Sequence, residues 1–114
     1  MMRQADIWTA ELPAQGGSGP GYKRPVVVVQ GDRLNASRLA TVVVVPCTSN
    51  VKWANVHGNV LLPPRSGLSK PSVANVSQIS AVARAFLIKR VARVSPIELE
   101  AIVAGVQFVL GQES

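Results

Sequence analysis

The sequence predicts a mainly β fold, namely a small, curved, mostly antiparallel barrel that ends in one amphipathic helix. Three observations predict it: short runs of β-branched residues, loops rich in glycine and proline between them, and a helix-start signal followed by a helical apolar repeat near the end of the chain. The 114 residues suit one domain over residues 1–114, and a 47% hydrophobic content is enough for one packed core.

The strands are expected where β-branched and aromatic residues gather. Residues 5–12 predict the first strand, and the Gly- and Pro-rich segment 13–23 predicts a mobile loop. The valine runs at 25–30 and 41–47 predict two strands that are buried on both faces and joined by a polar connector. Further strands are expected at 56–62, 72–82 and 90–94, with a short helical turn within 83–90.

The C-terminal helix has the clearest local signal. Ser95 followed by Glu98 forms a capping-box pattern, with Pro96 at the first helical position. Apolar residues then recur at steps of three and four, and Gly111 is expected to end the helix. This apolar stripe comprises Leu99, Ile102, Val103, Val106, Val109 and Leu110.

The charge of the chain is strongly positive and unevenly placed. Twelve lysines and arginines face six acids, which gives a formal net charge of +6. All twelve basic residues lie within residues 1–94, whereas residues 95–114 carry three acids and no base. Such a basic body attracts polyanions, of which nucleic acid is the commonest, although a merely soluble basic protein is the alternative.

Cys47 is the only cysteine, so no disulfide can form within the chain, which suits a reducing compartment such as the cytoplasm. Its position after a valine run predicts a buried structural thiol rather than a nucleophile. No N-terminal signal segment and no apolar run long enough to span a bilayer is present, so no membrane association is expected.

Several kinds of chemistry are excluded by the residues that are missing. His57 is the only histidine, and no cluster of histidine, cysteine and carboxylates has ligand spacing, so neither a metal nor another cofactor is expected. The segment 16–21 lacks the lysine and the helix that follow a phosphate-binding loop.

Basic and hydroxyl residues at strand ends remain. If the two valine strands are antiparallel neighbours, Arg24 and Thr48 lie at the same end of the sheet. A guanidinium and a hydroxyl there can hold a phosphate in a fixed pose. From spacing alone, the alternative is that Arg24 is a surface charge and Thr48 a turn residue.

A family resemblance supports the first interpretation. The order of DIW, a Gly-rich loop, KRPVVVVQ, VVVPCTS, VSQIS and SPIELEAI resembles the MazF/PemK toxins over nearly the whole chain. The most specific matches are Arg24-Pro25 followed by four valines, and Pro46-Cys47-Thr48-Ser49.

The resemblance implies an SH3-like antiparallel barrel of the MazF/CcdB type, a homodimer, and a sequence-specific, metal-independent endoribonuclease that cleaves single-stranded RNA such as mRNA. It also implies a cognate MazE-type antitoxin whose extended acidic segment blocks the RNA site. Arg24 and Thr48 match the catalytic residues of the family, and Ser49 matches a neighbouring substrate contact. The segment Asn75–Gln78 lacks the charged residue that some members place before the glutamine.

Other residues are candidate contacts to RNA. Tyr22 and Trp53 can stack on unpaired bases, whereas Trp8 is expected to pack inside the fold. Lys23, Lys52 and Gln78 are candidate substrate contacts, and His57 is a candidate general base because imidazole titrates near neutral pH. Arg65, Lys70 and Arg84 are further candidate contacts to the RNA backbone.

Two other functions stay open at this point. One is a CcdB-like toxin that poisons gyrase without cutting nucleic acid, although residues 108–114 lack the tryptophan that those toxins carry near the end of their helix. The other is a degenerate member that binds RNA or an antitoxin without cleavage.

Overall fold

A computed structural model describes residues 1–13 and 21–112. In this part of the chain the strands are β1 (Asp6–Leu12), β2 (Tyr22–Val28), β3 (Thr41–Thr48), β4 (Val60–Leu62), β5 (Ser72–Ala74), β6 (Ser80–Ala83) and β7 (Leu87–Arg93). The helices are α1 (Asp32–Asn35) and α2 (Pro96–Val109), and the 3₁₀ turns are η2 (Val51–Asn55), η3 (Val76–Gln78) and η4 (Arg84–Phe86).

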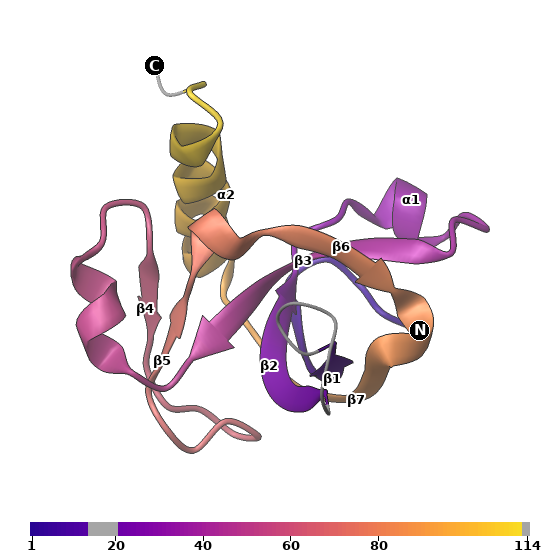
Figure 1. Cartoon of the computed structure of the whole chain (residues 1–114), viewed down its shortest axis with the longest axis horizontal. Helices are drawn as coiled ribbons and strands as arrows, with labels where there is room; N and C mark the ends of the chain where they lie inside the picture. Colours follow the sequence, from indigo (N-terminus) through magenta and orange to yellow (C-terminus); the bar gives the residue numbers. More distant parts are fainter. Residues whose placement is uncertain (14–20, 113–114) are drawn as a thin grey trace.

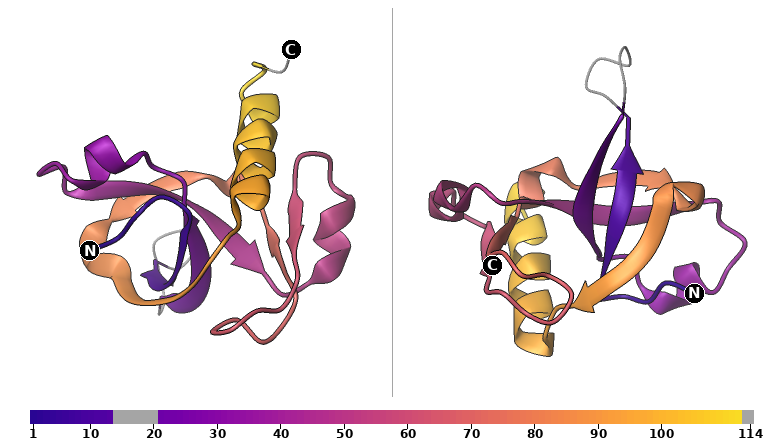
Figure 2. Two further views of the ribbon diagram at one scale, coloured as in Figure 1. Left: turned by 180° about the vertical axis from the view of Figure 1, so that it is seen from behind. Right: turned by 90° about the horizontal axis from the view of Figure 1, so that it is seen from below.

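The strands form one curled antiparallel sheet in the order β4-β5-β3-β2-β1-β7, with β6 added to β3. Figure 1 shows β4 and β5 on one side of β3, and β1, β2 and β7 on the other. Both views of Figure 2 place α2 beside the β4–β5 pair and away from the N-terminus. The predicted barrel with one terminal helix is therefore confirmed.

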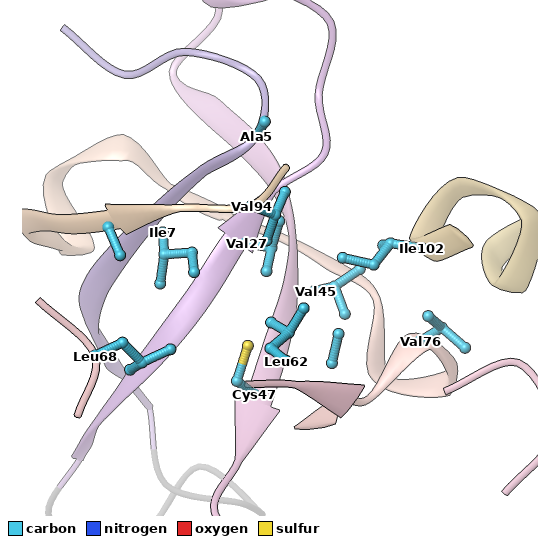
Figure 3. Packing of buried hydrophobic residues seen from close by; sticks show 12 residues of the cluster. Ala5, Ile7, Val27, Val45, Cys47, Leu62, Leu68, Val76, Val94 and Ile102 are labelled. Carbon is cyan, nitrogen blue, oxygen red and sulfur yellow. The ribbon is translucent and has the colours of Figure 1, made fainter. Parts of the chain in front are cut away.

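The two valine strands are buried on both faces, as predicted. Val27, Val45 and Cys47 point into one core cluster, which Ile102 of α2 and Leu62 of β4 complete (Figure 3). The alternate positions Val26, Val28, Val42 and Val44 point into a second cluster with Ala10 and Leu12 of β1. Because side chains alternate along a strand, one unbroken valine run serves both clusters.

The prediction of one strand over 72–82 is wrong, because the segment divides into β5, η3 and β6. Both short strands pair with the same edge of β3, but their registers differ by three residues: Cys47 faces Ala74, whereas Val44 faces Ser80. Pro46 lies between them, and it accepts a hydrogen bond from the Asn75 N–H at 2.9 Å while having no N–H to return. The ladder therefore breaks at Pro46.

Three smaller predictions are also corrected. The strand expected at 56–62 is limited to β4, and the polar connector contains the short helix α1. The loop expected over 13–23 ends earlier, because Tyr22 and Lys23 already pair with Leu12 and Glu11 of β1. Residues 14–20 of that loop lie outside the described residues. The turn within 83–90 is confirmed as η4, but the last strand begins at Leu87 rather than at residue 90.

The helix α2 begins as the sequence predicts. The Ser95 hydroxyl accepts from the Glu98 N–H at 3.1 Å, and the Glu98 carboxylate accepts from the Ser95 N–H at 2.8 Å. Gly111 follows the helix with φ of +73°, a conformation that glycine adopts without strain.

The expected apolar stripe is only partly correct. Ile102 is buried, and Leu99 and Val106 pack against the core beside it. Val103, Val109 and Leu110 are exposed, so only one side of α2 packs against the core, where it contacts β4 and η3. On this side Gly105 approaches Gly58, in the turn before β4, so closely that a Cβ would lie 2.1 Å from the Gly58 carbonyl oxygen. No helix in the described part of the chain is long and apolar enough to span a membrane.

An ion pair joins the start of α2 to the loop after β4. Arg65 donates two hydrogen bonds to the Glu98 carboxylate, at 2.6 and 2.7 Å, and both side chains are 19% exposed. Arg65 also donates to the carbonyls of Pro63 and Arg93. The hydrogen bonds that the Glu98 carboxylate accepts from Arg65 and Ser95, above all those from Arg65, lower the pKa of this carboxyl.

Replacing Glu98→Gln should lower the free energy of unfolding by about 2 kcal/mol at pH 7, because it removes a bidentate charged pair but keeps a side chain that can complete the capping box. A lowered pKa in the folded state stabilises the fold above the unfolded pKa, and this stability is lost as pH falls through the folded value. Urea unfolding should therefore show the difference shrinking below about pH 4.3. The exposed Glu100→Gln variant is the control, and an equal loss there would contradict the assignment.

The Cys47 thiol is 1% exposed, and burial raises its pKa to about 12. We expect it to react with a disulfide reagent at pH 8 only after denaturation, because the thiolate is the reactive form. Absorbance of the released thiol checks this, and rapid labelling of the native protein would show that Cys47 is accessible.

Candidate active site

The pairing of β2 with β3 brings Arg24 and Thr48 together. Val26 faces Pro46 in this antiparallel pair, and continuing the register by two residues sets Arg24 opposite Thr48. Both side chains leave the sheet on the same face, because positions two apart along a strand point the same way. The expectation that these two residues share one end of the sheet is confirmed.

Two open cavities flank this pair, and both are lined by Lys23, Arg24 and Thr48. The smaller cavity has a volume of about 380 Å³, and the larger one has a volume of about 710 Å³. The smaller is completed by Pro25, Cys47, Ser49, Gly67, Leu68, Ser69, Lys70 and Ser72. The larger is completed by Tyr22, Pro46, Trp53, Asn75 and Gln78.

The positive charge at this site is not neutralised by the fold. The Arg24 guanidinium carbon lies 5.0 Å from the centre of the Tyr22 ring, a cation–π contact that leaves its N–H donors free. Neither ion pair in the described part of the chain involves Arg24, and no carboxylate lines either cavity. The site therefore suits an anion, and its lysines add to the attraction.

The hydroxyl of Thr48 has a defined direction of hydrogen bonding. Its Oγ1 accepts from the Asn50 N–H at 3.2 Å, as β3 turns into η2. A hydroxyl has one proton to donate, and that proton remains for a ligand. Arg24 and Thr48 can thus both donate to a ligand at the two cavities that they line. Within residues 1–13 and 21–112, no three His, Cys, Asp or Glu side chains gather as a metal site would require.

The structure brings most of the expected substrate contacts to this place. Tyr22, Trp53 and Gln78 line the larger cavity, Ser49 lines the smaller, and Lys23 lines both. Trp53 is 45% exposed, as a stacking platform requires. Lys52 belongs to η2 beside Trp53 but lines neither cavity.

His57 lies elsewhere. It lines a separate cavity beside α2, and its ring centre is 4.2 Å from that of Phe108. It lies in the turn before β4 rather than on the strand expected there, and it lines neither of the cavities that Arg24 and Thr48 share. The structure therefore places His57 apart from the Arg24–Thr48 pair.

Two of the arginines considered as RNA contacts are used within the fold. Arg65 holds Glu98, and Arg84 donates to the carbonyls of Leu34 and Asn35, both at 2.8 Å. Lys70, in contrast, lines the smaller cavity. Trp8 packs against the second core cluster and donates to the buried Asp6 carboxylate at 3.2 Å, as expected for a structural tryptophan.

Sequence reasoning missed Asn75 and Asn59. Asn75 directly follows β5 and lines the larger cavity, and Asn59 donates a hydrogen bond to its side chain. A polar residue at the end of a buried strand is the same signal that identified Thr48. It was hidden here because residues 72–82 looked like one continuous strand.

The comparisons with known proteins show the family of the chain. Residues 3–110 match the family model of PemK-like, MazF-like toxins of type II toxin–antitoxin systems. The endoribonuclease MazF6 of Mycobacterium tuberculosis is 39% identical over 111 residues, which cover 96% of this chain and 97% of the relative. MazF9 of the same organism is 37% identical over 103 residues, 87% of each chain.

The fold is also similar to a solved structure. A crystal structure of MazE–MazF from Deinococcus radiodurans has a chain that superposes with a TM-score of 0.79 at 19% identity, covering 98% of this chain and 97% of that one. Taken with the sequence match over residues 3–110, this chain belongs to the PemK-like, MazF-like toxin family of type II toxin–antitoxin systems.

Proposed function

We propose that this chain is a sequence-specific, metal-independent endoribonuclease that cleaves single-stranded RNA through the 2′-hydroxyl of its own substrate. One observation carries the proposal: Arg24 of β2 lies opposite Thr48, the last residue of the neighbouring antiparallel strand β3, and both residues line the same two cavities. Relatives of nearly equal length, such as MazF6 of Mycobacterium tuberculosis, are named endoribonucleases. In this proposal Arg24 and Thr48 are the catalytic residues.

The reaction depends mainly on stabilising negative charge at the phosphate, and few protein groups are needed for this. The 2′-oxygen loses its proton and forms a bond to the adjacent phosphorus, while the bond from phosphorus to the 5′-oxygen breaks and that oxygen takes up a proton. The products are a 2′,3′-cyclic phosphate and a 5′-hydroxyl. Negative charge on the phosphoryl oxygens increases toward the transition state, where a fixed guanidinium stabilises it most.

Arg24 supplies that guanidinium, and it is available for the phosphate because no ion pair among residues 1–13 and 21–112 involves it. Thr48 donates its hydroxyl proton to a phosphoryl oxygen, because the Asn50 N–H already occupies one of its lone pairs. Two fixed donors restrict the rotation of the phosphate and favour in-line attack by the 2′-oxygen. His57 has no part in this mechanism, because it lines a different cavity.

The walls of the site favour an unpaired strand. Trp53 and Tyr22 are 45% and 42% exposed beside the larger cavity, and each can stack on a base that is free of a partner strand. Ser49, Lys23 and Lys70 provide hydrogen bonds and positive charge on the side of the smaller cavity. One strand can therefore cross the Arg24–Thr48 pair with a base on either side.

The proposal includes a cognate antitoxin of the MazE type, a homodimer, and action in the cytoplasm. The MazF of Deinococcus radiodurans has been solved together with MazE. An extended acidic segment would complement the basic, carboxylate-free cavities and block RNA. Exposed apolar residues on α2, including Ile97, Val103 and Phe108, give a second copy a surface to cover.

The first test is cleavage of a fluorogenic RNA oligonucleotide by purified protein, with EDTA present. Arg24→Ala should lower the cleavage rate by about 10²-fold or more, because it deletes the fixed charge at the transition state. Sequencing of the RNA ends should find 5′-hydroxyl termini. Arg33→Ala on the exposed helix α1 is the matched control and should keep the full rate.

Full activity of Arg24→Ala, with its unfolding curve unchanged, would remove Arg24 from the mechanism. RNA binding without cleavage by the wild-type protein would support the degenerate member instead. Inhibition of gyrase without cleavage would support the CcdB-like alternative.

A second substitution tests the hydroxyl. Thr48→Val keeps the shape of the side chain but cannot donate, so the cleavage rate should fall by about tenfold to a hundredfold, whereas Thr48→Ser should keep most of it. Steady-state kinetics should assign the loss to kcat. Thr41→Val, at the exposed far end of β3, is the control, and a similar loss there would point to a structural effect.

A further inference from the structure

The larger cavity is lined by the side-chain amide of Asn75, whose orientation is set through Asn59 by main-chain groups. Asn75 lines this cavity with Trp53 and Gln78, and its main-chain N–H is held by the Pro46 carbonyl at 2.9 Å. Its side chain is partly exposed and contacts two neighbours, Asn59 and Ser77. An amide side chain can present either an oxygen or an NH₂ group to a ligand, and the difference decides which bases it accepts.

Asn59 determines the first orientation. Its Nδ2 donates to the Trp53 carbonyl at 3.0 Å, and its Oδ1 accepts from the Val76 N–H at 3.0 Å. Both partners are main-chain groups, so one can only accept and the other can only donate. Turning the Asn59 amide over would set an oxygen against an oxygen and an NH₂ group against an N–H. Its orientation is therefore fixed.

Asn59 in turn sets the orientation of the Asn75 side-chain amide. The Asn59 Nδ2 also donates to the Asn75 Oδ1 at 3.4 Å, and the Ser77 hydroxyl donates to the same oxygen at 3.3 Å. Because the fixed Asn59 NH₂ group can only donate, the Asn75 oxygen faces it and the Asn75 NH₂ group lies on the other side of the amide. That NH₂ group has no hydrogen-bond acceptor among the residues that the structure describes.

We propose that Asn75 is a specificity-determining residue that presents a fixed NH₂ donor to an RNA base stacked on Trp53, and that Asn59 is the residue that positions it. The inference rests on the proposed RNA cleavage. A fixed donor favours a base with a carbonyl oxygen at the edge it faces, as in the O4 of uracil or the O6 of guanine. It disfavours cytosine and adenine, which carry an amino group at the corresponding place.

The hydrogen-bond geometry explains why a fixed donor discriminates. A freely turning amide would accept either kind of edge with little loss, as Gln78 can, since no partner for its side chain is found in the described part of the chain. Asn75 would have to give up the hydrogen bond from the fixed Asn59 NH₂ group before it could offer its oxygen instead, and its own NH₂ group would then face that donor. One position of the cleaved motif should therefore depend on Asn75 and on the residues that hold it.

The experiment uses full-length protein and a pool of RNA oligonucleotides with a randomised central segment, whose cleaved ends are sequenced. At one position the wild-type protein should prefer uracil or guanine over cytosine or adenine by about tenfold, the value of one hydrogen bond. Asn75→Asp keeps the oxygen that Asn59 and Ser77 contact but replaces the NH₂ group by an acceptor. It should reverse the preference at this position only.

Two further variants separate specificity from folding. Asn75→Ala should cut all four versions of that position at similar rates, and Asn59→Ala should weaken the preference there while the other positions of the motif stay fixed. Asn55→Asp is the matched control, because it adds the same charge on η2 without lining the cavity. It should slow all substrates alike and leave the motif unchanged.

The outcomes distinguish this inference from the proposed function. If wild-type protein and Asn75→Asp cut the same motif, Asn75 does not read the base, although the nuclease proposal stands. If Asn75→Ala and Asn59→Ala also keep every preference of the wild type, the positioning role of Asn59 fails too. A wild-type protein that cuts no member of the pool overturns both proposals.

Discussion

The pairing of two valine runs, β2 with β3, is the interaction on which the rest of the structure depends. The register is set by burial, because each run feeds one core cluster with its odd positions and another with its even positions. A slip of one residue would turn every valine to the wrong cluster. It would also remove Arg24 from its position opposite Thr48, because the register that pairs Val26 with Pro46 sets both positions. Core packing and site geometry are therefore one constraint.

The main chain also decides which groups the site offers to a ligand. The Asn50 N–H occupies a lone pair of Thr48, and the Trp53 carbonyl and the Val76 N–H orient Asn59. The Asn59 amide cannot turn over freely, because the reversed amide would leave two main-chain groups unpaired. The site thus presents mainly donors, and it does so without a carboxylate nearby. Phosphate oxygens and base carbonyl oxygens are the complementary acceptors.

Local patterns were sufficient for much of this fold. The two valine strands and the capping box at Ser95 and Glu98 follow from short-range periodicity and the chemistry of single residues. The shared sheet end of Arg24 and Thr48 follows once the two strands are taken as antiparallel neighbours. Long-range pairing was not readable in the same way. The break at Pro46 depends on which edge of β3 faces β5, and the use of Arg65 by Glu98 joins positions 33 residues apart. The place of Asn75 in the site was not predicted for the same reason, because it depends on the division of residues 72–82 into β5, η3 and β6.

The loop between β4 and β5 shows how firmly one wall of the site is built. Gly67, with φ of +87°, approaches β7 so closely that a Cβ would overlap the Val91 carbonyl oxygen, and Arg65 anchors the same loop to α2. Gly67, Leu68, Ser69 and Lys70 of this loop all line the smaller cavity. Their conformational entropy is already lost when the chain folds, so little more is lost when a ligand arrives. This wall of the smaller cavity should therefore select ligands by excluding shapes that do not fit, rather than by changing its own conformation.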